Sequence, residues 1–284
     1  MQIVFSRYIP LTVIAAGFTL LLSCGKESKL NPPLLPDEYS LPQGNQPIDD
    51  TIVSFKKRYG TYILYKFSHR DFAYSSGAML TDTAAPGDPA HIAELYIYFR
   101  DNCLSWYPES FRRKALPFKL LFSSAVGSPL PGGAIAPGRG FVSTREMLAI
   151  GWANDKLAGL GPVERKALTA RMHRYFMTRA LQGRSIPVPV EYLALYPISF
   201  DGIGESNKYD RGIIEVQNST THNVATDIGS FVEAIAGKTT AELEAGILSP
   251  QSDRKGLIRR KYNILVRVFM DQYGVDLVAI GNKP

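Results

Sequence analysis

The sequence is poor in cysteine, and this excludes a disulfide framework. Its 284 residues contain two cysteines, Cys24 and Cys103. Cys24 ends an apolar leader, so Cys103 has no intrachain partner. Cys103 falls on the apolar stripe of an expected helix, with no cationic helix start nearby to lower the pKa of its thiol. We therefore expect Cys103 to be a buried small hydrophobic residue rather than a reactive thiol.

Familiar catalytic and nucleotide-binding patterns are also lacking. The glycine- and proline-rich loop at residues 127–140 does not end in the Gly-Lys-Ser/Thr of a phosphate-binding loop, so a plain loop is expected. No Gly-x-Ser-x-Gly elbow of a serine hydrolase occurs. The four histidines, His69, His91, His173 and His222, include no pair four residues apart. That spacing is the one that lets two histidines on one helical face bind the same zinc ion.

The N-terminus has the layout of an export signal. Arg7 precedes an apolar run from Tyr8 to Leu22, which is short for a transmembrane helix. The following Leu21-Leu22-Ser23-Cys24 resembles a bacterial lipobox. Residues 1–23 are therefore predicted to be a lipoprotein signal peptide, and Cys24 the lipidated first residue of the mature chain, anchored in a membrane.

The charge balance is basic, but export makes nucleic acid an unsuitable partner. The net charge is +6 for the whole chain and +5 after removal of residues 1–23, because Arg7 is the single charge in that segment. An anchored, exported protein rarely meets nucleic acid. An anionic membrane surface, anionic glycans and acidic peptides are better suited to this charge.

A proline-rich segment separates the lipidation site from the folded part. Residues 24–48 carry Pro32, Pro33, Pro36, Pro42 and Pro47. They are predicted to form an extended tether that reaches about 70 Å at most. One continuous domain is expected from residue 49 to residue 284.

Strands and helices are mixed along this domain, which indicates an α+β fold with a mixed sheet. Strands are expected at residues 61–67, 118–124 and 146–152, and helices at residues 49–60, 88–106, 162–182, 226–237 and 255–274. A short helix is expected from Thr239, whose side chain forms a capping box with Glu242. The central helix at 162–182 begins with Pro162, stops before Gly183, and buries Leu168, Met172, Tyr175 and Phe176.

The order of these parts resembles a known family. The lipobox and tether are followed by "YGTYILYKF", "LPFKLLF", "ARMHRYFMTRAL…VPVEYLALYPISF" and "RRKYNILVRVFMDQYGVDLVAI". Together they resemble the substrate-import-associated zinc metallohydrolase lipoproteins of Bacteroidetes, which are zincin-like metallopeptidases. The resemblance implies a zincin-like fold with a central motif-bearing helix and C-terminal helices. It also implies an outer-membrane location, facing the periplasm or the cell surface, beside a nutrient transporter.

In that family a helix carries His-Glu-x-x-His, and a later helix supplies a glutamate ligand. Laid over this sequence, the first histidine is His173, the general base falls at Arg174 and the second histidine at Met177. The third ligand falls at Ser230, with Glu233 one helical turn further. An arginine cannot accept a proton at neutral pH, and a thioether is a poor ligand for zinc. We therefore expect these four residues to mark a vestigial cleft without catalytic residues, zinc or another cofactor.

Three interpretations of His173 remain open. It packs as a structural residue, or it lies in a vestigial cleft that binds an anion through Arg174 and Arg171, or it holds a metal through a rearranged set. That set would combine His173, His222 and either Asp227 or Glu233.

The sequence therefore predicts a membrane-anchored lipoprotein whose metallopeptidase-like domain has lost its zinc. It would bind an anionic peptide or glycan as an accessory of a nutrient-import system and an outer-membrane transporter complex. The alternative is an active zinc metallohydrolase or peptidase with the rearranged ligand set.

Overall fold

The computed structural model describes residues 38–73, 80–136, 138–216 and 222–283. The predicted signal peptide, the lipidation site Cys24 and most of the tether lie outside these residues. The compact unit begins at Ser40, nine residues before the predicted start of the domain. Gln43 already belongs to it, because its side-chain oxygen accepts hydrogen bonds from the backbone of Tyr65 and Lys66. Within the described residues, no helix has the length and apolar character needed to cross a bilayer.

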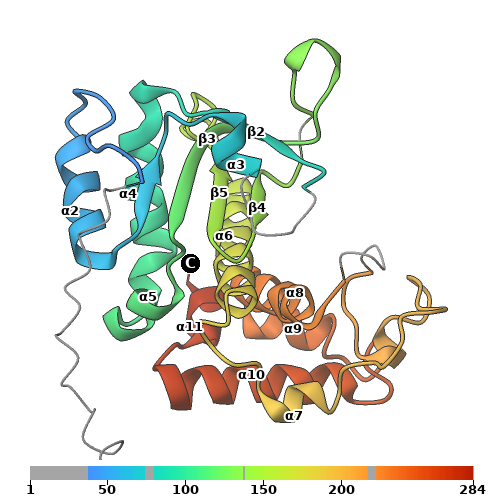
Figure 1. Ribbon diagram of the computed structural model, residues 1–284. Coiled ribbons are helices and arrows are strands. Elements are labelled where there is room, and N and C mark those ends of the chain that lie inside the picture. The colour runs from blue at the N-terminus through green and yellow to red at the C-terminus, as the bar shows by residue number, and fades with distance from the viewer. Residues whose placement is uncertain (1–37, 74–79, 137, 217–221, 284) are drawn as a thin grey trace, which may run out of the picture. The chain divides into compact units, whose positions relative to one another are not determined.

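A mixed sheet forms one layer of the unit (Figure 1). Its strands are β1 (Tyr62–Leu64), β2 (Thr83–Pro86), β3 (Lys119–Gly127), β4 (Phe141–Ser143) and β5 (Met147–Gly151). The order is β1-β3-β5-β4, and β2 pairs with the second half of β3. β3 runs parallel to β1 and β5, whereas β2 and β4 are antiparallel additions. β4 is an edge strand of the sheet.

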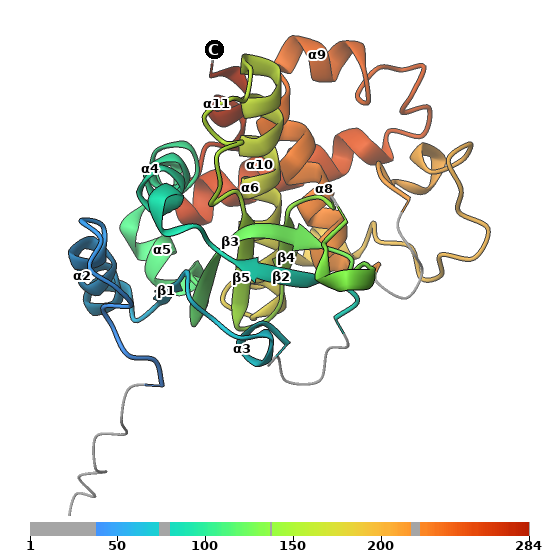
Figure 2. The ribbon, with the colours of Figure 1, turned by 90° about the horizontal axis from the view of Figure 1, so that it is seen from above.

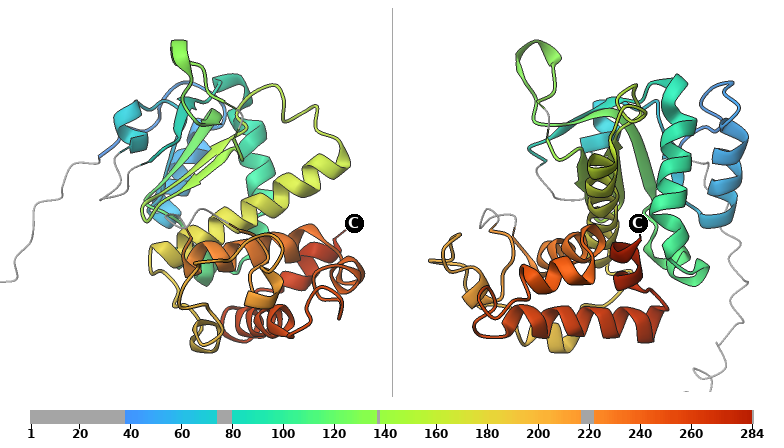
Figure 3. Two further views of the ribbon diagram at one scale, coloured as in Figure 1. Left: turned by 90° about the vertical axis from the view of Figure 1, so that its right-hand side faces the viewer. Right: turned by 180° about the vertical axis from the view of Figure 1, so that it is seen from behind.

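Helices dominate the second half of the chain. The first half contains α2 (Asp49–Tyr59), α3 (His69–Ala73), α4 (Ile92–Asn102) and α5 (Glu109–Ala115). The second half contains α6 (Pro162–Gln182), α7 (Val190–Leu193), α8 (Val224–Gly237), α9 (Thr240–Ala245), α10 (Leu257–Tyr273) and α11 (Leu277–Asn282). The left view of Figure 3 shows α4 and α6 on the same face of the sheet. Figure 2 shows α6 lying between α4 and α8. The predicted α+β class is confirmed, whereas the strands β2 and β4 and the short helices α3, α5, α7 and α11 were missed.

The helix at the centre, α6, begins and ends where the sequence indicates. Pro162 occupies the first turn, where a missing N–H costs nothing, and the Glu164 carboxylate accepts a hydrogen bond from Gly161 N at 2.8 Å. The chain leaves the helix at Gly183. Along α6, Leu168, Met172 and Phe176 are fully buried, as the apolar spacing predicts. Tyr175 is half-buried and stacks on Phe141 of β4, with ring centroids 5.1 Å apart.

The other long apolar stripe ends earlier than predicted. α4 stops at Asn102, and Cys103 leaves the helical conformation before a short 3-10 turn at Leu104–Trp106. Cys103 is nevertheless fully buried and free, which confirms its expected role as a small hydrophobic residue. Burial raises the pKa of its thiol well above the ordinary value, so the thiol is protonated at neutral pH.

Candidate functional site

The predicted site residues on α6 lie on two different faces of the helix. His173 and Met177 are fully buried in the core. His173 contacts the end of α4 and Tyr107 after it. Arg174 and Thr178, one position further along, line a cavity beside β4 and the start of α8. Because residues four apart share a helical face, the pair that faces the cavity is 174 and 178, not 173 and 177.

His173 is a satisfied core residue. Its Nε2 lies 3.0 Å from the Asn102 carbonyl oxygen, which can only accept, so Nε2 carries the proton. Nδ1 then accepts a hydrogen bond from the Tyr107 hydroxyl at 2.8 Å. Burial lowers the pKa of His173 to about 4, and the ring is neutral at physiological pH. Both ring nitrogens are therefore occupied within the protein.

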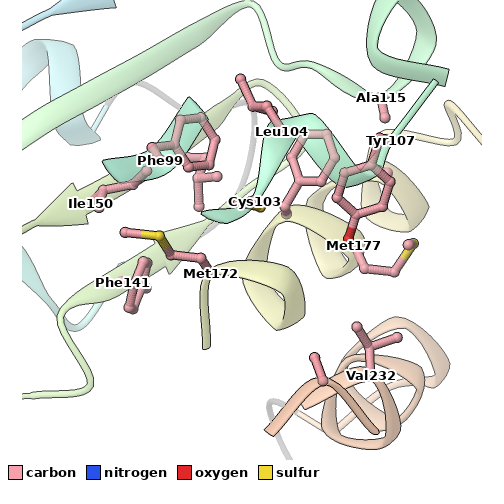
Figure 4. Packing of buried hydrophobic residues seen from close by; sticks show 14 of the residues in the cluster. Phe99, Cys103, Leu104, Tyr107, Ala115, Phe141, Ile150, Met172, Met177 and Val232 are labelled. Carbon is pink, nitrogen blue, oxygen red and sulfur yellow. The ribbon is translucent and has the colours of Figure 1, made fainter. Parts of the chain in front are cut away.

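The other two predicted cleft residues, Met177 and Ser230, also lie in different surroundings. Met177 belongs to the hydrophobic core that also contains Tyr107 and Val232 (Figure 4). Ser230 lines a cavity on α8, but its hydroxyl donates to the carbonyl oxygens of Thr226 and Asp227 in its own helix. Of the four predicted cleft residues, Arg174 and Ser230 reach cavities, whereas His173 and Met177 lie in the core.

Arg174 is held by two carboxylates from distant parts of the chain. Its Nη1 donates to Glu215 at 2.5 Å and to Glu233 of α8 at 2.6 Å. Burial alone would lower the pKa of Arg174, but the hydrogen bonds and charges of the two glutamates outweigh it and raise the pKa. Conversely, burial would raise the pKa of Glu215, but Arg174 and Arg139 lower it. Arg139 also pairs with Glu215 and approaches Glu233 at 3.8 Å.

This four-residue ion-pair network stands between two cavities. One, of about 550 Å³, is lined by Arg174, Thr178 and β4, and the other, of about 560 Å³, by Ser230 and Glu233. Arg139 and Glu215 line both cavities. The Arg139–Glu215 pair therefore marks the boundary between the two cavities.

The second cavity, beside Ser230, carries an excess of positive charge. Arg139, Arg171 and Lys238 line it, against Glu215 and Glu233. Among the described residues, the Arg171 guanidinium donates only to the backbone carbonyls of Ala167 and Arg139. Lys238 makes no hydrogen bond or ion pair with any described residue. Of the three cations that line this cavity, Arg171 and Lys238 are thus the two that bond no described carboxylate.

These side chains do not fit a zinc ion. The cavity face of α6 offers an arginine and a threonine, and both nearby carboxylates are engaged by guanidinium groups. In the described part of the chain, no three His, Cys, Asp or Glu side chains gather as a metal-binding group. The rearranged set fails at His173, whose two ring nitrogens are bonded to Tyr107 and Asn102 in the core. Asp227 uses only Oδ2 to accept from Lys261 and Tyr192, and its Oδ1 has no partner among the described residues. No catalytic step through zinc follows from this arrangement.

Sequence reasoning missed three charged residues of the region, Arg139, Glu215 and Lys261. The Lys261 ammonium is fully buried, donates to Asp227 at 2.7 Å and lies 4.8 Å from the centre of the Tyr192 ring. A signal existed for it, since Lys261 stands three residues after Ile258 and four before Leu265, within the apolar stripe of α10. Arg139 and Glu215 lie in irregular segments, and no local pattern marks them.

Comparison with known proteins supports the fold but gives no closer relationship. No family model matches the sequence, and no curated protein matches it. The fold is similar to the crystal structure of a "putative zinc-binding metallo-peptidase" from Bacteroides caccae, with a TM-score of 0.52. The two chains are 14% identical, and the match covers 81% of this chain and 86% of the other. The predicted metallopeptidase-like fold is confirmed at this level.

Proposed function

We propose that this protein is a lipid-anchored lipoprotein whose metallopeptidase-like domain binds a ligand without hydrolysing it. The observation that carries the proposal is the Arg174 guanidinium, bonded to Glu215 and Glu233 on the cavity face of α6. A permanent cation there opposes the binding of a second one. Hydrolysis by a metal-activated water requires at least two further protein ligands beside a carboxylate, and Thr178 is a poor substitute for histidine.

The proposed ligand is an acidic peptide or an acidic glycan. Arg174 is not the group that would take its carboxylates, because its donors are already directed to two glutamates. Arg171 and Lys238 are better placed, since both line the second cavity and neither bonds a carboxylate in the described part of the chain. Tyr209 lines the same cavity and adds an aromatic surface suited to a sugar or peptide.

The cellular setting of the proposal rests on the N-terminal sequence and on the family resemblance. The lipobox at Leu21–Cys24 and the proline-rich segment after it support an anchor on the outer membrane with a spacer. A binding domain on such a spacer would hold or present a substrate beside an outer-membrane transporter. We propose this accessory role in nutrient import.

Metal content tests the loss of catalytic zinc. The purified full chain is loaded with zinc, dialysed and measured by mass spectrometry. We expect far less than one zinc per chain, because Arg174 holds the carboxylates that a metal would need. Near-stoichiometric zinc would overturn the proposal and favour a hydrolase with a rearranged ligand set.

Titration with acidic probes tests the proposed class of ligand. A hexa-aspartate peptide and trigalacturonate are titrated against the full chain by calorimetry, with the corresponding neutral peptide and neutral trisaccharide as controls. We expect the Arg171→Gln/Lys238→Gln variant to bind the acidic probe at least about tenfold more weakly, the loss of one to two charge-assisted contacts. Lys156→Gln, at an exposed lysine outside both cavities, serves as the matched control and should not change the affinity. Equal binding by all three proteins, or no binding of either probe, would contradict the proposed ligand class.

A further inference from the structure

A third cavity lies at the opposite end of α6 from Gln182. It occupies about 490 Å³ where the first turns of α6 meet α4, α8 and α11. Figure 2 shows the start of α6 beside α11. The volume is in the range of small-molecule sites, which are commonly apolar with a few polar groups at defined points. Nothing in the proposed function uses this cavity.

The walls of this α6–α11 cavity are mainly apolar. Val163, Ala236 and Ile280 line it, together with Tyr98. Val163 is 83% exposed, although a large apolar side chain is usually covered. A ligand seated here would remove part of that side chain from water, with a gain of roughly 25 cal/mol per Å² buried.

The polar groups of the wall are already bonded within the protein. The Tyr98 hydroxyl donates to the Arg165 carbonyl oxygen at 2.9 Å and lies 3.0 Å from Thr169 Oγ1. The Arg165 guanidinium donates to the carbonyl oxygens of Leu157, Ala158 and Leu160. These groups shape the wall and leave few donors for a ligand.

The ammonium groups of two lysines are the exception: no described group accepts a hydrogen bond from either, although that of Lys283 lies 5.8 Å from the centre of the Trp106 ring. Lys166 and Lys283 line the cavity, and neither makes a hydrogen bond or ion pair to a described carboxylate. Each acts through space on one acidic residue outside the lining, and that residue is bonded elsewhere. Asp101 is paired with Arg100, and Glu242 accepts from Thr239. The described lining contains no aspartate or glutamate, so the cavity is positively charged.

The cavity is preformed. α11 approaches α8 so closely that a Cβ on Gly281 would overlap the carbonyl oxygens of Ile235 and Lys238. A Cβ on Gly237 would lie 3.0 Å from that of Ala170 on α6. These glycines fix the spacing of the three helices, and a ligand would not have to open them.

We propose that the α6–α11 cavity binds an amphiphilic carboxylate, with its apolar body on Val163, Ala236 and Ile280 and its carboxylate on Lys166 and Lys283. The class of ligand is inferred from the charge of the two lysines and from the apolar wall. Two ammonium groups that bond no described carboxylate favour an anion, and the apolar wall favours a hydrocarbon or aromatic body. Two sources share this chemistry, an alkyl-chain acid and the carboxylate of an apolar amino acid.

Calorimetric titration of the full chain distinguishes the sources. Decanoate represents the alkyl-chain acid and N-acetylphenylalanine the amino acid, while decanamide and N-acetylphenylalaninamide are their neutral counterparts. We expect one acid to bind at least about tenfold more tightly than its amide, as one charge-assisted contact provides. Tight decanoate binding identifies the alkyl source, and tight N-acetylphenylalanine binding the amino-acid source. Failure of both acids to bind, or equal binding of acid and amide, would overturn the proposal.

Variants locate the bound acid. Lys166→Met/Lys283→Met keeps the aliphatic stems and removes the charges, and it should abolish the preference for acid over amide. Lys156→Met is the matched exposed control, and Arg171→Gln separates this cavity from the one beside Ser230. Both should bind the acid as the parent chain does. An unchanged preference in the double variant would place the acid elsewhere and contradict the proposal.

Discussion

The two faces of α6 each bury a polar side chain, neutral on the core face and charged on the cavity face. On the core face, His173 is kept neutral and both of its nitrogens are hydrogen-bonded. On the cavity face, Arg174 stays charged and is compensated by Glu215 and Glu233. The difference follows the surroundings, since the side chains of Glu215 and Glu233 keep 25% and 27% exposure whereas His173 has none. On α6, the charged arginine is therefore the one whose carboxylate partners are partly exposed, and the fully buried histidine is the neutral one.

Of the changes that compare the two faces of α6, truncation of Met177 should lower the free energy of unfolding most. Met177→Ala leaves a void in the core, and such changes cost about 3 kcal/mol of unfolding free energy. Thr178→Ala, one residue along on the cavity face, loses a methyl group and a long 3.4 Å bond to the Ala225 carbonyl oxygen, at a cost of about 1 kcal/mol. Urea unfolding of both variants measures the difference. Equal costs would mean that the two faces are not distinct in packing.

Acidification should lower the stability of the fold, because His173 is buried in its neutral form. Its pKa is about 4 in the folded chain and about 6.5 when unfolded, so the unfolded state binds more protons between these values. Stability is therefore fully present above pH 6.5 and falls by about 3 kcal/mol by pH 4. His173→Gln keeps a donor and an acceptor without titrating, so the difference between the two proteins isolates the effect. A difference that stays constant from pH 7 to pH 4 would show that His173 is not buried in its neutral form.

Sequence patterns locate α6 but not its orientation toward the cavity. Pro162, Gly183 and the apolar spacing define the ends and the buried stripe, because these are local properties of the helix. The predicted cleft nevertheless used 173 and 177. Which polar positions face a cavity depends on α8 and on the segment around Glu215, which lies 41 residues from Arg174. The partner in such a distant ion pair leaves no periodic trace in the sequence. For Lys261, the apolar stripe of α10 indicates burial, but it does not identify Asp227 as the partner.

β4 illustrates the same limit in the sheet. It has three residues, Phe141–Ser143, too few for an alternating pattern, and it exists by pairing with β5. The stripe of α4 shows the converse error. Its apolar spacing continues through Cys103 although the backbone leaves the helix there, because burial rather than helical geometry keeps Cys103 apolar.

Removing the charge of Arg174 should have a smaller effect with the opposite pH dependence. Arg174→Met leaves Glu215 and Glu233 without their main partner, and we expect a cost of about 2 kcal/mol at pH 7, less than for a fully buried pair because both glutamates are partly exposed.

Without Arg174, burial raises the pKa of Glu215 relative to the parent chain, so the folded variant binds a proton more readily. The deficit should therefore shrink between pH 7 and pH 5, measured as the difference from the parent chain. Arg171→Met, which loses only backbone contacts, is the control and should cost less than about 0.5 kcal/mol. A deficit that grows on acidification would refute the ion-pair account of this face.

The smallest effect concerns the close approach of α8 to the cavity face. A Cβ on Gly229 would overlap Thr178 Oγ1 and lie 3.3 Å from Arg174 Cγ. In a helix, Gly→Ala alone gains about 1 kcal/mol, but overpacking costs about 1–3 kcal/mol, so Gly229→Ala should destabilise the chain by about 1 kcal/mol. Adding Thr178→Ala removes the overlapping hydroxyl. The double variant should then be more stable than the sum of the two single changes predicts, by at least about 0.5 kcal/mol in a double-mutant cycle. Strict additivity would mean that α8 moves away freely from this face, and the Arg174–Glu233 pair would then lack the fixed helix spacing that now holds it.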